Sequence, residues 1–193
     1  MNRTVNEKRP EELRQAILEY LMEHGVSDLS LRPLAKAVGS SPRVLLYYFG
    51  SREKMLTMVF QDIRQRQRAT YGAPTTGTIG EACRAAWADF MNTGAERHFR
   101  LYFEAYGLAL RNPEIYRDFL DSTIEDWLGT IATGLAAGGA EQSEARALAS
   151  VILAGMRGFM LDYCTTGDRE RLDGAVGIWS QALDTIPIQK RED

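Results

Sequence analysis

Positively charged side chains gather in one acid-free part of the chain, between Asp28 and Glu53. The basic residues of this window are Arg32, Lys36, Arg43 and Arg52. Residues 1–68 carry 12 Lys and Arg against 8 Asp and Glu, whereas residues 69–193 carry 11 against 18. Such an uneven distribution is expected when the basic part of a chain binds a polyanion. Chance clustering would explain the charge alone equally well.

Residues 42–49 form the segment of this window whose side chains could contact nucleic-acid bases. At about 100° per residue, a helix over this segment has two faces. One face carries Pro42, Leu45 and Phe49, with Leu46 at its margin, and the opposite face carries Arg43, Val44, Tyr47 and Tyr48. Arg43 can bond a guanine edge bidentately, and Val44 can touch a thymine methyl group. Both tyrosine hydroxyls can donate to phosphates, although the rings could instead pack on a neighbouring domain.

Capping and turn residues predict that this segment is the second helix of a helix-turn-helix. Ser30 can cap a helix over residues 31–38, and Ser41-Pro42 can open the next one as N-cap and first helical residue. Residues 39–41 supply the short glycine-containing turn between them. Helix starts attract phosphate oxygens. The candidate DNA-binding residues are Ser30, Arg32, Ser40, Ser41, Pro42, Arg43, Val44, Leu46, Tyr47, Tyr48 and Arg52.

The elements that must position these residues are helices, because the helical period continues along nearly the whole chain. Gly, Pro and Ser separate helical segments expected at residues 11–24, 31–38, 42–49, 52–70, 78–95, 97–111, 113–137, 141–166 and 168–186. The pattern predicts an all-α fold of about nine helices. We expect an N-terminal three-helix helix-turn-helix domain over residues 1–52, followed by a helical ligand-binding and dimerisation domain over residues 53–193.

The run from Gly25 to Leu56 resembles the TetR family of transcriptional regulators. It has the glycine after the first helix, the small-residue turn, the aromatic run that closes the second helix of the motif, and a basic residue that opens the fourth helix. The chain departs from the family pattern at Leu46, where tyrosine is usual, at Tyr48, where histidine is usual, and at Arg52, where lysine is usual.

This resemblance covers about residues 10–60 and implies more than the residues alone. It implies a homodimer that binds a palindromic double-stranded DNA operator. It also implies a small-molecule effector whose binding changes the separation of the two DNA-contacting helices, with repression as the mode of action.

Residues 144–163 predict a helix with two apolar faces, which is typical of a helix that is buried twice. The face with small residues includes Gly155 and Gly158, where each glycine costs roughly 1 kcal/mol of helix propensity and therefore indicates close approach of another helix. We expect a four-helix bundle with two helices from each subunit, although both faces could be covered within one subunit. The candidate dimer residues are Val151, Ala154, Gly155, Gly158, Asp162, Ala175, Trp179 and Leu183.

Aromatic and methionine side chains are frequent after residue 86, and a subset could line a cavity for a small apolar ligand. A filled core without a ligand is the alternative. The candidate ligand-binding residues are Trp87, Phe90, Met91, Phe103, Tyr106, Trp127, Met156, Phe159 and Tyr163. Polar candidates are few (Asp89, Glu104 and Asp162), which favours a ligand that is mostly apolar.

Motifs for catalysis and metal binding are absent from the sequence, so we expect no enzyme, no metal and no cofactor. The chain has no GxSxG, P-loop or HExxH motif. Cys83 and Cys164 form no CxxC pair, and they offer no zinc cluster with the two histidines. The first residues lack the apolar region of a secretory signal, and no apolar stretch is long and charge-free enough to span a membrane.

A cytoplasmic, nucleoid-associated protein is therefore expected. The rival interpretation is a helical protein-interaction module that does not bind DNA. It would explain the apolar helix faces, but it would not explain the acid-free basic window or the face formed by Arg43, Tyr47 and Tyr48.

Overall fold

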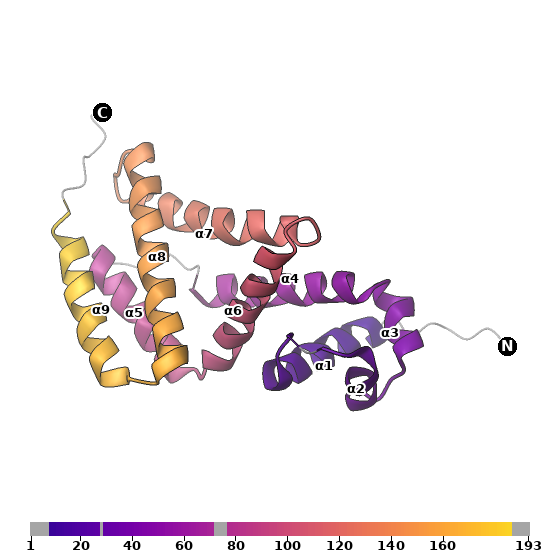
Figure 1. Cartoon of the computed structure of the whole chain (residues 1–193). Coiled ribbons are helices and arrows are strands. Elements are labelled where there is room, and N and C mark those ends of the chain that lie inside the picture. Colours follow the sequence, from indigo (N-terminus) through magenta and orange to yellow (C-terminus); the bar gives the residue numbers. More distant parts are fainter. Residues whose placement is uncertain (1–7, 28, 72–76, 187–193) are drawn as a thin grey trace. The chain divides into compact units, whose positions relative to one another are not determined.

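The computed structural model describes residues 8–27, 29–71 and 77–186, and this part of the chain contains nine helices and no strand (Figure 1). The helices are α1 (Lys8–His24), α2 (Leu31–Ala37), α3 (Pro42–Phe49), α4 (Arg52–Tyr71), α5 (Ile79–Asn92), α6 (Glu96–Arg111), α7 (Arg117–Ala137), α8 (Gln142–Thr166) and α9 (Arg169–Asp184). The predicted all-α fold is confirmed.

Most helix ends lie within two residues of the expected positions, and α1 begins at Lys8 rather than at residue 11. Two other differences have a local cause. α5 ends at Asn92 because Thr93 and Gly94 follow as a turn, and Gly94 has a φ of 67° that terminates the helix. α7 begins at Arg117 and not at residue 113. The carbonyl of Asn112 accepts hydrogen bonds from the amides of Ile115 and Tyr116, so residues 112–116 form a separate turn.

The chain divides into two compact units, and α4, α6 and α7 contribute residues to both. One unit contains the described residues up to Ile63 together with Leu101–Leu120. Its core is made of fully buried side chains from α1 to α4, including Ile17, Leu34, Leu45 and Leu56. The rings of Phe60 and Phe119, with centroids 5.2 Å apart, join α4 to the start of α7. This unit holds the predicted helix-turn-helix.

The other unit contains the described residues of Arg64–Arg100 and those from Asp121 onward. Its tightest pair is α5 with α9, where an added Cβ at Gly80 would overlap the backbone carbonyl oxygen of Ser180. The Gly80 amide donates to Asp184 Oδ1 at 2.6 Å, and Trp87 Nε1 donates to Asp173 Oδ1 at 2.6 Å. Because the two helices approach at backbone distance, only glycine fits at position 80.

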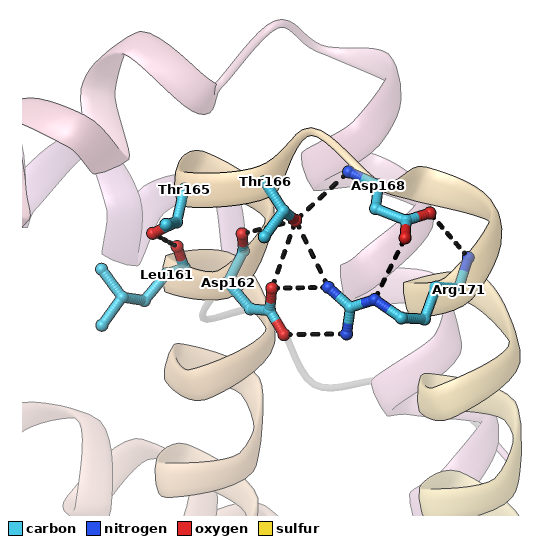
Figure 2. A network of polar contacts seen from close by, with 6 residues as sticks. All are labelled: Leu161, Asp162, Thr165, Thr166, Asp168 and Arg171. Atoms are coloured by element: carbon cyan, nitrogen blue, oxygen red, sulfur yellow. Dashed lines mark hydrogen bonds and ion pairs between the residues drawn. The ribbon is translucent and has the colours of Figure 1, made fainter.

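α8 and α9 form a helical hairpin closed by one arginine. Figure 2 shows the Arg171 guanidinium between the carboxylates of Asp162 and Asp168, with contacts of 2.7 Å and 3.1 Å. Thr166 Oγ1 accepts from Arg171 Nη2 and from the Asp168 amide, each at 3.3 Å. The hydrogen bonds from Arg171 lower the pKa of Asp162. This network fixes the sharp turn at Gly167, whose φ is 67°.

Contrary to the sequence-based expectation, α8 is long and apolar enough to cross a bilayer by length and composition, and it is the only such helix among the described residues. Its apolar side chains have another explanation here. Leu153 and Ala149 are buried in a cluster with Leu128 of α7, and Phe159 contacts Trp87 of α5 and Trp179 of α9. The hydropathy of α8 therefore reflects burial among other helices of the same unit.

Candidate nucleic-acid interface

The turn between α2 and α3 has the hydrogen bonds of a capped helix end followed by a capped helix start. Gly39, with a φ of 63°, follows α2, and the Ser40 amide donates back to the Ala35 carbonyl at 2.8 Å. Ser41 Oγ then accepts from the Val44 amide at 3.3 Å, with Pro42 as the first helical residue. The predicted cap at Ser41 is therefore present.

Ser30 does not cap α2 with its side chain, contrary to the sequence-based expectation. It occupies the N-cap position with extended backbone, but its hydroxyl makes no cap hydrogen bond. The Ser30 carbonyl accepts from the Leu34 amide at 3.3 Å, as a first helical hydrogen bond. Backbone geometry alone therefore starts this helix, and the exposed Ser30 hydroxyl points to no partner among the described residues.

α3 is anchored by Leu45 and Phe49, which are 0% and 4% exposed. The exposed face consists of Pro42, Arg43, Leu46 and Tyr47, whereas Val44 and Tyr48 are half-buried. Helical spacing had placed Pro42 with the buried residues, Leu46 at their margin, and Val44 and Tyr48 on the exposed side. Helical spacing fixes the angles between the side chains of α3. The packing of neighbouring helices then determines which of the side chains next to Leu45 and Phe49 are covered.

The most exposed large hydrophobic side chain of α3 is Tyr47, at 74%. Its ring stands edge-on to that of Tyr48, with centroids 5.2 Å apart. Tyr47 is therefore free to contact a partner, while Tyr48 supports it from the half-buried side.

Three basic side chains near α3 are exposed and have no acidic partner within the described residues: Arg32, Lys36 and Arg43. Uncompensated positive charge next to an exposed helix face is the arrangement that attracts phosphates. Ser40 Oγ, in the turn, is buried and makes no hydrogen bond with the described residues.

Arg52 has a structural contact that the sequence did not indicate. Its Nε donates to the Leu29 carbonyl at 3.2 Å, and Nη1 lies 4.0 Å from Glu53 Oε1. Arg52 thus ties the start of α4 to the connection between α1 and α2. The terminal guanidinium nitrogens of Arg52 are the atoms that could still donate hydrogen bonds to a phosphate.

Glu104 of α6 contacts the same connection, and sequence reasoning had considered it only for a ligand. Its carboxylate Oε2 accepts from the Val26 amide at 2.8 Å. The preceding Gly25 has a φ of 73°, and an added Cβ there would lie 2.5 Å from Glu104 Oε2. The contact joins positions 78 residues apart, so no local sequence signal could have revealed it.

The structure brings together four of the candidate ligand-binding residues. Trp87 and Phe90 of α5 meet Phe159 and Tyr163 of α8, with ring-centroid distances of 5.4 to 6.5 Å. Trp87 and Phe90 are buried, and the indole N–H of Trp87 is satisfied by Asp173. Phe159 and Tyr163 are half-buried, so they are the members of this aromatic cluster with surface still available.

The remaining candidates lie on α5, α6, α7 and α8. Phe103 and Tyr106 belong to the unit that contains α3, where both rings contact Tyr102. Trp127 packs on the α7–α8 cluster, while Met156 is buried and Met91 half-buried.

The candidate dimer residues divide into two groups. Val151, Ala154 and Gly158 are exposed on α8, and nothing lies within 4 Å of a Cβ added at Gly158. The others are at least partly engaged within the subunit. Gly155 faces the Trp179 ring, Asp162 pairs with Arg171, Leu183 is 3% exposed, and Ala175 is half-buried.

Two further apolar residues are exposed and are not among the candidate dimer residues. Ile178 of α9 is 74% exposed, and Leu161 of α8 is 48% exposed. We define the α8–α9 outer face as Val151, Ala154, Gly158, Leu161 and Ile178. Helical spacing did not show that Leu183 is buried while Ile178 is exposed.

Nucleophilic and metal chemistry find no support in the described residues. Burial raises the pKa of both Cys83 and Cys164 to about 11, so both thiols are protonated at neutral pH. No group of three or more His, Cys, Asp or Glu side chains in the described ranges is placed to hold a metal ion.

Comparison with known proteins gives one family match. Residues 13–59 match the model of the bacterial regulatory proteins of the tetR family. This segment contains the α2–α3 motif and most of its supporting core. The comparison with curated proteins gave no sequence match.

Solved structures resemble nearly the whole chain. A transcriptional regulator from Rhodococcus sp. Rha1 is 20% identical with a TM-score of 0.75, covering 92% of this chain and 99% of its own. A TetR-family transcriptional regulator from Rhodococcus sp. is 18% identical with a TM-score of 0.75, covering 93% and 100%. The multidrug binding protein EbrR, in complex with imidazole, is 17% identical with a TM-score of 0.70, covering 95% and 99%. The fold is that of these regulators.

Proposed function

Because this chain carries the N-terminal domain of the tetR family of bacterial regulatory proteins, we propose that it is a transcriptional repressor. Two copies bind a palindromic operator, and a small, mostly apolar ligand releases them. We assign DNA binding to residues 1–52, and ligand sensing with dimerisation to residues 53–193. The protein acts in the cytoplasm, on the nucleoid, and catalyses no reaction, since regulators of this family are not enzymes.

The exposed face of α3 is the main support for DNA binding. Arg43 and Tyr47 are exposed on a helix whose other side is buried by Leu45 and Phe49. A two-turn helix of this kind fits the major groove, where an arginine can bond guanine O6 and N7 together. Arg32 and Lys36 lie in the same acid-free window and can bond phosphates.

Selection of bound sequences from a random duplex library tests this function. The protein is first unfolded in urea and refolded, so that no copurified ligand holds it in a released state. Enrichment of one palindromic motif at moderate salt would support a dimeric, sequence-specific regulator. A folded protein that enriches no sequence would refute the function and favour the helical protein-interaction module.

Substitutions at Arg43 separate base recognition from charge. Arg43→Ala should weaken specific binding by roughly 1–3 kcal/mol per half-site and relax the base preference at one position. Arg43→Lys retains the charge but lacks the planar fork, so it should keep the salt dependence and weaken the preference. Unchanged preference in both variants would exclude Arg43 from base recognition.

The α8–α9 outer face supports a homodimer. Its side chains are apolar or absent, and Val151, Leu161 and Ile178 are 48%, 48% and 74% exposed. Exposed apolar patches mark interaction sites. Ile178→Glu should therefore convert the dimer to monomers in sedimentation velocity. Leu110→Glu is the matched control, because Leu110 is 62% exposed on α6 and lies outside this face. Dissociation by the control, or none by Ile178→Glu, would contradict the assignment.

The aromatic cluster of Trp87, Phe90, Phe159 and Tyr163 supports an apolar ligand, and the similar protein EbrR is a multidrug binding protein. Phe159→Leu keeps an apolar side chain of comparable size at a half-buried position. It should reduce release of a fluorescent operator by apolar aromatic compounds, while operator affinity without compound stays unchanged. Equal release from both proteins would mean that Phe159 only fills the core.

A further inference from the structure

The exposed face of α3 has two chemically different columns. Arg43 and Tyr47, four residues apart, form a polar column. Pro42 and Leu46, also four residues apart, form an apolar column beside it. Leu46 is 40% exposed, whereas the next apolar residues of the helix, Leu45 and Phe49, are buried. The apolar column therefore contributes little to the core of its own unit.

An apolar side chain on a DNA-contacting face has one specific partner in the major groove. Among the groups that the four base pairs present there, only the thymine 5-methyl group is apolar. The exposed arginine and lysine side chains of the acid-free window favour DNA as the occupant of this face. Leu46 would be solvated without DNA and desolvated against a methyl group in the complex.

The spacing along α3 also fits neighbouring base pairs. Arg43 and Leu46 are three residues apart, which is about 4.5 Å along a helix axis. Successive bases of one strand are about 3.4 Å apart. Val44, the residue that the sequence pattern had favoured for a methyl contact, is half-buried and lies on the other flank of Arg43.

Resting on the function proposed above, we propose that Leu46 recognises a thymine 5-methyl group in each half-site, within one or two base pairs of the guanine bound by Arg43. The residue thus sets part of the operator specificity through an apolar contact. Pro42 extends the same apolar column by one helical turn.

A uracil scan of the selected operator tests the proposal. Replacing thymine by deoxyuridine removes only the 5-methyl group and leaves the hydrogen-bonding groups in place. One position per half-site should lose about fourfold in affinity, as expected for one buried methyl-sized group, and about fifteenfold when both half-sites are changed. Fluorescence anisotropy of labelled duplexes measures these values.

Variants identify the residue that contacts the methyl group. In Leu46→Ala, thymine and uracil operators should bind equally at the sensitive position, while Val44→Ala should retain the full difference. A double-mutant cycle between Leu46 and the methyl group then isolates their coupling. Leu46 is exposed, and circular dichroism will verify that the variant stays folded.

The results distinguish failure of the Leu46 contact from failure of the DNA-binding function. A flat uracil scan on an enriched operator, or uracil sensitivity that persists in Leu46→Ala, would overturn the role of Leu46. Loss of sensitivity in Val44→Ala alone would assign the contact to Val44. If no operator is enriched at all, the DNA-binding function itself fails, and this outcome is seen before any uracil is introduced.

Discussion

Two glycines on α8 should respond in opposite directions to the same substitution. An added Cβ at Gly155 would lie 2.7 Å from Trp179 Cε2 and closer still to Cζ2. The indole cannot easily retreat, because its ring centroid lies 5.3 Å from that of Phe159. Overpacking of this kind typically lowers the free energy of unfolding by about 1–3 kcal/mol. The better helix propensity of alanine offsets about 1 kcal/mol of this loss. Gly155→Ala should therefore lower the free energy of unfolding by about 1 kcal/mol.

Gly158→Ala is the matched control, three residues along the same helix. No atom lies within 4 Å of a Cβ at this position, so only the propensity term remains. The free energy of unfolding should rise by about 1 kcal/mol. The two variants should therefore differ by about 2 kcal/mol, although they carry the same chemical change.

Urea unfolding followed by far-ultraviolet circular dichroism measures both values, provided that the dependence of the unfolding free energy on urea concentration is the same in both variants. The experiment is repeated over a range of protein concentrations, since a partner helix against Gly158 would reduce its gain as the dimer forms. Stabilisation by Gly155→Ala at every concentration would refute the packing of Trp179 on α8. Destabilisation by Gly158→Ala at the lowest concentration would refute the open position of Gly158.

Three further predictions concern hydrogen bonds and thiols. Glu104→Ala removes the acceptor of the buried Val26 amide and should lower the free energy of unfolding in urea by about 1–3 kcal/mol. Glu104→Gln keeps a carbonyl acceptor and should lower it clearly less. Equal losses in the two variants would exclude the hydrogen bond as the cause. The pKa of Asp162 is lowered in the folded protein, so its contribution is present at neutral pH and lost as the pH falls below the ordinary value of 3.8. Asp162→Asn should accordingly reduce the fall of the urea unfolding midpoint as the pH is lowered, and an unchanged pH dependence would contradict this. Cys83 and Cys164, both with a pKa of about 11, should react with iodoacetamide at pH 8 only after urea is added; rapid labelling of the native protein would show that they are accessible.

Local signals predicted the helix-turn-helix because its determinants are close in sequence. The cap at Ser41, the proline after it and the glycine before it act over a few residues. The same reasoning failed at Ser30, since a capping residue type allows a hydrogen bond but does not require one. It also missed the turn at residues 112–116, where helical spacing continues through the amino acids that form it.

Faces of helices were predicted less well than the helices themselves. Helical spacing grouped Leu183 with the dimer residues, but it is buried within its own unit, and it left Ile178 unnoticed at 74% exposure. The sequence suggested close approach of another helix at both glycines of α8. In the structure the two differ, because Gly155 faces Trp179 while no other group lies close to Gly158. These outcomes depend on how helices distant in sequence pack, which periodicity does not encode.

The contact between Gly25 and Glu104 constrains how this sequence can diverge. A side chain at position 25 must adopt a φ near 73° and would meet the carboxylate of position 104. Asparagine tolerates that backbone conformation better than other residues, but it would displace the Glu104 carboxylate and break its hydrogen bond with the Val26 amide. The amino acids allowed at positions 25 and 104 are therefore linked, although 78 residues separate Val26 from the carboxylate that its amide binds. A change at position 25 costs both the strain of a positive φ and this hydrogen bond, whereas a change at position 104 costs only the hydrogen bond.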